Sequence, residues 1–228
     1  MLGVYTGPMM KVVSVNVGLP KQVSYGKRQV VTSIFKEPVE RRVKVTRLNL
    51  DGDAQADLSV HGGFDKAVYS YPEEHYKYWK EVYPSIVMPF GMFGENLTTQ
   101  GLTEDMVNIG DQYQIGSSRL VVTQPRMPCY KLGIKFGRMD ILEKFVNSRR
   151  PGIYYKVLEE GELGAGDNIK LLYKDKNNVT INDIVSLYIN DRNDEGSISK
   201  MKKATKSKFL PEPWKIYFDQ KIAQLQKS

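Results

Sequence analysis

The chain has few of the residues on which common metal and disulfide sites depend. Its 228 residues contain one cysteine, Cys129, and two histidines, His61 and His75. A single cysteine excludes an internal disulfide and any zinc or iron–sulfur site built from several thiolates. Neither histidine belongs to an H-x-x-x-H or H-x-E pattern, so hydrolytic zinc chemistry lacks its ligands.

Long apolar runs are also missing. No run approaches the roughly 20 residues that span a bilayer, and residues 1–10 lack the basic segment and apolar stretch of a secretory signal. We therefore expect a cytoplasmic protein with no membrane partner. Hydrophobic residues make up 41% and charged residues 26% of the chain, which is typical of a globular protein.

The charge of the chain favours anionic partners. Lysine and arginine total 33 against 26 aspartate and glutamate, a net charge of +7. Phosphate groups, nucleic acid and acidic proteins all fit this sign. The 14 tyrosines would suit a nucleic-acid-binding module, but no RNP or helix-turn-helix pattern is present, so nucleic acid is the least favoured partner.

Short β-rich segments separated by glycine, proline and aspartate dominate the chain up to about residue 174. Gly116-Ser117-Ser118 suits a tight hairpin turn, and helices are predicted at 72–82 and 139–147. The other predicted strands share β-branched residues in short runs: 11–17, 29–35, 40–48, 66–71, 112–115 and 119–124. We expect a mostly β, α+β fold with a barrel-like domain at 11–174, after an N-terminal extension at 1–10.

The pattern becomes helical after residue 177. Thr180 is a candidate N-cap for a helix through Ile184 and Tyr188, and two further helices are predicted at 199–207 and 214–226. We therefore expect a small three-helix domain at 178–228. Its lysines between 200 and 208 suit a solvated helix face better than an acidic partner or nucleic acid. Since this segment contains no cysteine or histidine, we expect it to control access or dock a partner and to supply no redox chemistry.

Two loops carry glycines beside polar side chains. In Val60-His61-Gly62-Gly63-Phe64-Asp65-Lys66, the adjacent glycines allow backbone N–H groups to approach an anion, and Lys66 adds charge. A glycine turn beside a surface lysine is the alternative. In Phe93-Gly94-Glu95-Asn96-Leu97, Asn96 can read the edge of a heterocycle or tie two loops together.

The most unusual segment is Gln124-Pro125-Arg126-Met127-Pro128-Cys129-Tyr130-Lys131-Leu132. Two prolines end the preceding strand and stiffen the loop that presents Arg126 and Cys129. Arg126 and Lys131 beside a thiol would lower its pKa and favour the thiolate, which attacks or binds metal. The alternative is that Cys129 is an inert buried side chain.

Four motifs in this order, G-D-x-Q-A-D, H-G-G-x-D-K-A-V-Y, F-G-E-N-L and Q-P-R-x-P-C-x-K-L, resemble the YiiM-type members of the MOSC domain family. The resemblance implies a MOSC β-barrel followed by a small helical domain. It also implies a molybdenum cofactor, Mo-molybdopterin, with Cys129 as catalytic metal ligand and Asp53 near the open face of the metal, although Asp51-Gly52-Asp53 equally suits a turn. The residues implied to bind the cofactor are His61, Gly62, Gly63, Asp65, Lys66, Asn96, Thr98, Gln124, Arg126 and Lys131.

The function implied by the resemblance is reduction of N-hydroxylated substrates, including hydroxylaminopurine-type bases, to the amine. No flavin, nicotinamide or iron–sulfur motif is present, so electrons are expected from a separate reductase. Within the family, the alternative is a sulfur carrier with a persulfide on Cys129. Monomer and homodimer both remain open.

Overall fold

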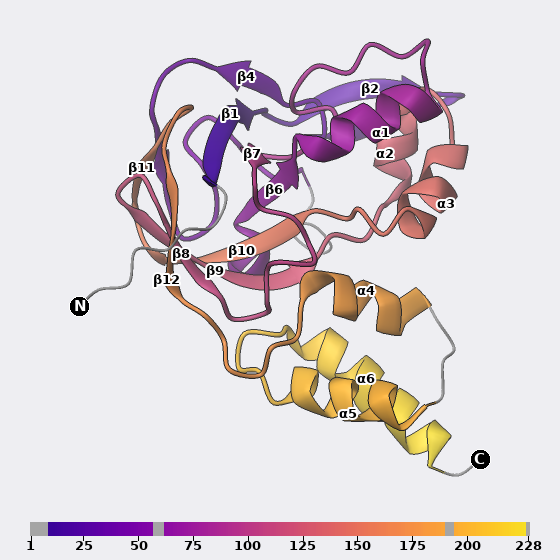
Figure 1. Ribbon diagram of the computed structural model, residues 1–228. Coiled ribbons are helices and arrows are strands. Elements are labelled where there is room, and N and C mark those ends of the chain that lie inside the picture. The colour runs from indigo at the N-terminus through magenta and orange to yellow at the C-terminus, as the bar shows by residue number, and fades with distance from the viewer. Residues whose placement is uncertain (1–8, 57–61, 190–193, 227–228) are drawn as a thin grey trace.

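The computed structural model describes residues 9–56, 62–189 and 194–226, which form an α+β fold (Figure 1). The strands are β1 Lys11–Val17, β2 Lys21–Tyr25, β3 Arg28–Thr32, β4 Glu37–Val39, β5 Val43–Val45, β6 Val68–Pro72, β7 Leu97–Gln100, β8 Gln112–Ile115, β9 Ser118–Pro125, β10 Ile153–Glu159, β11 Gly161–Leu163 and β12 Ile169–Tyr173. The helices are a 3₁₀ turn η1 Phe64–Lys66, and α1 Glu74–Val82, α2 Tyr130–Phe136, α3 Asp140–Asn147, α4 Ile181–Ile189, α5 Glu195–Thr205 and α6 Glu212–Leu225.

Eight strands form one curved sheet in the order β12-β8-β9-β10-β6-β7-β1-β4. Its pairs are antiparallel except β6 with β7. The curvature brings the start of β1 to the start of β12, where Val12 N donates to Asp167 O at 2.9 Å and Ile169 N donates to Met10 O at 2.8 Å. Within the described part of the chain these contacts do not extend into a continuous ladder. The α+β class is therefore confirmed, with a curled open sheet in place of a closed barrel.

Most predicted strands of the first 174 residues are present. β1 and β8 have the predicted bounds, and β8 joins β9 antiparallel with Ile115 opposite Ser118, which confirms the hairpin turn at Gly116. The segment 40–48 contains only the short β5, because the chain bends on both sides of it. No strand was predicted at β2, β4, β7 or β12, and no helix was predicted at α2.

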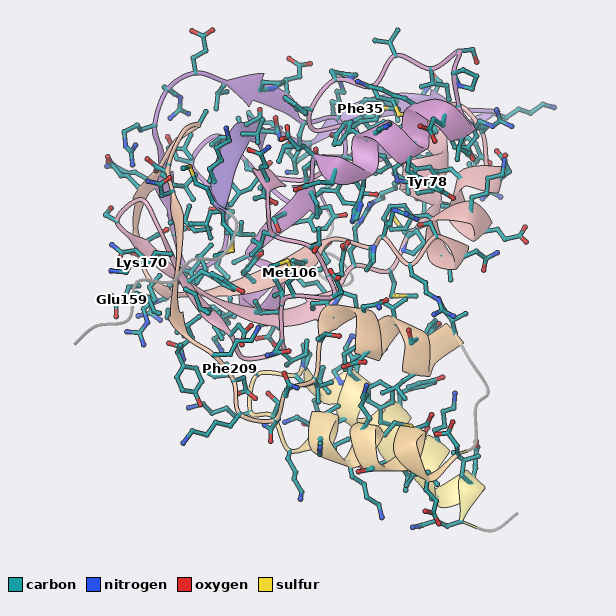
Figure 2. All side chains as sticks on the ribbon, in the orientation of Figure 1. Phe35, Tyr78, Met106, Glu159, Lys170 and Phe209 are labelled. Atoms are coloured by element: carbon teal, nitrogen blue, oxygen red, sulfur yellow. The ribbon has the colours of Figure 1, made fainter. Side chains whose placement is uncertain are left out.

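Helices α1, α2 and α3 lie together on one side of the sheet (Figure 1). Their aromatic side chains form a second core with β6, in which Tyr71, Trp79, Phe93 and Phe145 are fully buried. Figure 2 shows Tyr78 among the side chains between α1 and α3. This packed cluster gives a rigid support to the loops at 90–96 and 126–130.

Helices α4, α5 and α6 pack together below the sheet in the view of Figure 1. The predicted N-cap of α4 is confirmed, since Asp183 N donates to Thr180 Oγ1 at 3.0 Å and Thr180 N donates to Asp183 Oδ2 at 3.0 Å. The second helix begins at Glu195 rather than Ser199, because Asp194 caps it through Ser197 N.

One hydrophobic core joins the sheet to these helices. Val122 and Tyr155 of the sheet share it with Ile184 and Phe218 of the C-terminal helices. Met10, predicted to belong to an N-terminal extension, also lies in this core, whereas residues 1–8 lie outside the described residues. Of the helices described, none has the length and apolar character needed to cross a membrane.

Candidate functional site

A pocket of about 100 Å³ lies beside the loops that precede β6 and β7 and follow β9. We call it the basic pocket, because its wall carries four cations together with the only cysteine. The lining side chains that matter for its chemistry are Lys36, Asp53, Lys66, Arg126, Cys129 and Lys131. Residues far apart in the sequence, from the described parts of all four motifs, thus meet at one place.

Arg126 and Cys129 are brought to the pocket by the loop between β9 and α2. Arg126 follows the end of β9 directly, and Cys129 is the extended residue before α2, with φ −119° and ψ 166°. Cys129 is half-buried, whereas Arg126 is 7% exposed. The predicted stiff loop therefore holds both side chains at the pocket wall, although α2 begins one residue after Cys129 and takes Lys131 into its first turn.

The guanidinium of Arg126 is buried without a carboxylate. Its Cζ lies 5.2 Å from the ring centre of Tyr69 and 5.5 Å from that of Phe145, and Nη1 has no hydrogen-bond partner among residues 9–56, 62–189 and 194–226. Burial by itself lowers the pKa of Arg126, but Tyr69, Tyr154 and Cys129 more than offset this and leave the pKa raised. The side chain is thus a charged donor held ready for an anion.

Lys66 reaches the pocket from the 3₁₀ turn η1. Lys66 N donates to Gly63 O at 3.0 Å. Gly63 has φ 81°, a backbone conformation that residues other than glycine rarely adopt. Burial lowers the pKa of Lys66, and Asp65 offsets part of that effect. An anion in the pocket would favour the charged form of Lys66.

The carboxylate of Asp53 lies in the pocket wall and is fully engaged. It forms an ion pair with Lys36, accepts from Gly18 N at 2.9 Å and accepts from Asn96 Nδ2 at 2.9 Å. The side chains of Lys36 and Asp53 are 8% and 1% exposed, and burial lowers the pKa of Lys36 despite this contact. These bonds suit a residue that positions Lys36 and Asn96. The turn predicted as the alternative is also present, since Asp53 N donates to Leu50 O at 3.0 Å.

Asn96 ties two loops together, as one of the sequence alternatives anticipated. Its Oδ1 accepts from Tyr69 N at 3.1 Å while its Nδ2 donates to Asp53. The neighbouring Glu95 accepts from Gly91 N at 2.8 Å, Phe93 N at 3.0 Å and Thr98 Oγ1 at 3.0 Å. Glu95 is fully buried, and burial raises its pKa. This network shapes the pocket wall from beneath.

The remaining predicted residues fall elsewhere. Gly63, Asp65 and Gln124 line a second hollow beside the basic pocket, with which Gly62 and Lys66 are shared. Thr98 reaches neither hollow: it is fully buried, and its hydroxyl is taken up by Glu95 and Asn16. A direct contact from Thr98 to a ligand is therefore not supported. His61 lies outside the described residues.

Sequence reasoning missed two cations near the pocket. Lys36 follows β3 in a segment without a recognisable motif, and Lys135 lies one helical turn beyond Lys131 on α2. Lys135 donates to the carbonyl oxygens of Ile34 and Gly91, and burial lowers its pKa to about 8. The spacing of Lys131 and Lys135 could have indicated one basic face, had α2 been predicted.

The described residues contain no group of three or more His, Cys, Asp or Glu side chains able to hold a metal ion. A metal bound at Cys129 would thus need further ligands from a bound cofactor or from solvent.

Comparison with known proteins identifies the family of the chain. Residues 57–170 match the MOSC domain. The chain is 37% identical over 214 residues to YflK of Bacillus subtilis (strain 168), covering 94% of this chain and 95% of that protein. It is 41% identical over 143 residues to YiiM of Escherichia coli (strain K12), covering 62% of this chain and 64% of that protein.

Solved structures show the same fold. The crystal structure of YiiM from Geobacillus stearothermophilus superimposes with a TM-score of 0.77 at 33% identity, over 93% of this chain and 99% of that one. That of YiiM from Escherichia coli gives 0.72 at 27% identity, over 95% and 94%. The motif resemblance, the domain match and the shared fold thus agree, and the chain belongs to the MOSC domain family as a YiiM-type member.

Proposed function

We propose that this chain is a cytoplasmic, molybdenum-cofactor-dependent oxidoreductase that reduces N-hydroxylated substrates, such as hydroxylaminopurine-type bases, to the amine. Electrons would come from a separate reductase protein. The observation that carries the proposal is the basic pocket itself, where the only cysteine faces the same space as Lys36, Lys66, Arg126 and Lys131. A relative from Gibberella moniliformis named "Reductase", 33% identical over 63% of this chain but only 26% of its own length, supports the oxidoreductase class.

The residues of the pocket fit a ligand that combines an anionic phosphate with a sulfur-bound metal. Arg126 Nη1 is buried and has no partner among the described residues, and an anion would stabilise the charged form of the desolvated Lys66. Cys129 offers one soft thiolate, the ligand type that suits a metal already coordinated by sulfur. Arg126, Lys66 and Lys131 would hold the phosphate, with Cys129 on the metal.

When bound, the cofactor would supply two-electron transfer at the N–O bond. The overall reaction balances as R–NHOH + 2 e⁻ + 2 H⁺ → R–NH₂ + H₂O: the N–O bond breaks, nitrogen is reduced and the oxygen leaves as water. The cations of this chain would stabilise anionic groups in the pocket, and the buried network of Asp53, Asn96 and Glu95 would hold the walls in place.

The proposal is tested by metal analysis of protein produced in cells that can and cells that cannot synthesise the cofactor. We expect about one molybdenum per chain only in the first, together with turnover of hydroxylaminopurine with dithionite as reductant. Absence of molybdenum from protein made in competent cells, with unimpaired folding, would contradict it. A persulfide on Cys129 in metal-free protein that delivers sulfur to an acceptor would instead support the sulfur-carrier alternative.

A further inference from the structure

A second hollow of about 490 Å³ adjoins the basic pocket. We call it the aromatic groove, because Phe64, Met127, Tyr154 and Trp214 line it together with two prolines of the C-terminal segment. Lys66, Met127 and Tyr154 line both hollows, so the groove begins where the basic pocket ends. It lies between η1 and β9 of the sheet region and the start of α6.

The groove offers aromatic and apolar surface on both sides. Phe64 is 54% exposed, which is unusual for a phenylalanine and leaves one side of the groove apolar. Trp214 forms the other side, where the ring is fixed by contacts with Tyr188 and Phe218 at 5.5 and 5.8 Å between ring centres. Such surfaces favour a flat aromatic ligand.

Gln124 adds one directed polar group. It is 6% exposed, and its Oε1 accepts from Trp214 Nε1 at 3.0 Å. Because the indole N–H is only a donor, this bond fixes which end of the amide faces Trp214. The other end, Nε2, is buried and has no hydrogen-bond partner in the described part of the chain. A buried donor left in this way is rare, and a ligand with an acceptor atom would satisfy it.

We infer that the aromatic groove binds the heteroaromatic ring of the N-hydroxylated substrate, with Gln124 Nε2 donating to a ring acceptor. This inference rests on the proposed function, since it assigns the ring to the groove and the N–OH group to the side of Cys129. It also gives the C-terminal helices a part in substrate recognition through Trp214, whereas the sequence predicted only access or docking.

The first test is equilibrium binding of adenine, the amine that hydroxylaminopurine would yield, to the full-length protein by calorimetry. Phe64→Ala should weaken binding about tenfold, as expected for loss of one stacking surface. Gln124→Glu keeps the acceptor for Trp214 but removes the donor, and should also weaken binding. Ile216→Ala is the matched control, because Ile216 lies on α6, is 50% exposed and does not line the groove. Equal binding by all variants, or no adenine binding, would overturn the inference.

The second test compares turnover of hydroxylaminopurine with that of hydroxylamine, which has no ring. In cofactor-loaded protein, Phe64→Ala should raise KM for the purine about tenfold more than KM for hydroxylamine. A uniform change for both substrates would contradict the inference. A loss of molybdenum from Phe64→Ala with unchanged adenine binding would also contradict it, since the groove would then hold the cofactor. Adenine binding as expected, in protein that reduces no N-hydroxylated compound, would reject the proposed function and keep the groove as a heteroaromatic site.

Discussion

Replacing Arg126 by methionine should separate the contribution of its guanidinium to cofactor affinity from its contribution to the free energy of unfolding. The side chain is 7% exposed, forms no ion pair with the described carboxylates and leaves Nη1 without a partner. Arg126→Met keeps the length and the apolar stem and removes the charge. If the guanidinium is present for an anion, the protein without cofactor should tolerate its loss.

The expected magnitudes follow from the contacts. The variant loses two cation–π contacts, with Tyr69 and Phe145, of about 0.5 to 2 kcal/mol each. It also removes the buried Nη1 donor, which has no partner among the described residues and destabilises the folded protein by about 1 to 3 kcal/mol. These effects oppose one another, so the free energy of unfolding should change by about 1 kcal/mol or less. Cofactor binding should lose a charge-assisted hydrogen bond of about 1.5 to 3 kcal/mol, or roughly ten- to hundredfold in affinity.

The assay combines urea denaturation of cofactor-free protein with molybdenum content after reconstitution at limiting cofactor. Arg119→Met is the matched control, because Arg119 lies on β9, the strand that Arg126 follows, and its side chain is 38% exposed in an ion pair with Glu159. A loss of several kcal/mol in unfolding free energy with unchanged cofactor affinity would show that Arg126 is structural and would refute the argument.

Three further predictions concern residues that line the basic pocket or lie near it. Cys129→Ala should abolish bound molybdenum and N-hydroxylamine reduction. The unfolding free energy of the cofactor-free protein should change by about 1 kcal/mol or less, because Cys129 is only half-buried. Retained metal and activity would reject Cys129 as the metal ligand. Lys66→Glu should reduce cofactor loading at least about tenfold. Lys170→Glu should not, because Lys170 is exposed on β12 (Figure 2) and does not line the basic pocket; equal loading in both variants would place the phosphate elsewhere. Burial lowers the pKa of Lys135 to about 8, so between pH 8 and 10 the unfolded chain binds more protons at this residue than the folded protein does. The unfolding free energy, measured by urea denaturation at each pH, should therefore rise by about 2 kcal/mol over this range relative to that of Lys135→Met. A difference that does not change with pH would contradict the lowered pKa.

Local sequence signals accounted for the strongly patterned elements. Alternating apolar residues placed β1 with its observed bounds, and Gly116 between two such runs placed the β8–β9 hairpin. Thr180, followed by apolar residues at helical spacing, placed the start of α4. The structure adds Asp183, whose side chain accepts from Thr180 N while Thr180 accepts from Asp183 N. These features depend on residues close together in the chain.

Elements without such signals were missed for physical reasons. Helix α2 follows two prolines and has Gly133 in its middle, both of which disfavour helix, yet Leu132 and Phe136 are buried in the aromatic core and stabilise it. Among the strands that the structure describes, β2 and β3 pair only with each other, and their side chains are largely exposed, so no apolar alternation marked β2.

The candidate site was also predicted in part. The motif residues Asp53, Gly62, Lys66, Asn96, Arg126, Cys129 and Lys131 line one pocket, whereas their binding of a cofactor stays a prediction. The sequence did not identify Lys36, because its role depends on a buried contact with Asp53 across 17 residues. It also did not place Thr98 beneath the pocket wall.

By itself, the sequence determined the family, the mixed α+β class and the presence of one cysteine on a stiff, basic loop, because these depend on composition and on short motifs. Among the described residues, the tertiary structure alone decided which charged side chains are buried and which of them form ion pairs, since that depends on packing between distant segments. It brought Trp214 of α6 to Gln124 of β9 across 90 residues, and so joined the C-terminal helices to the wall of the site. No local pattern encodes that contact, because it forms only when the helices and the sheet bury one shared core.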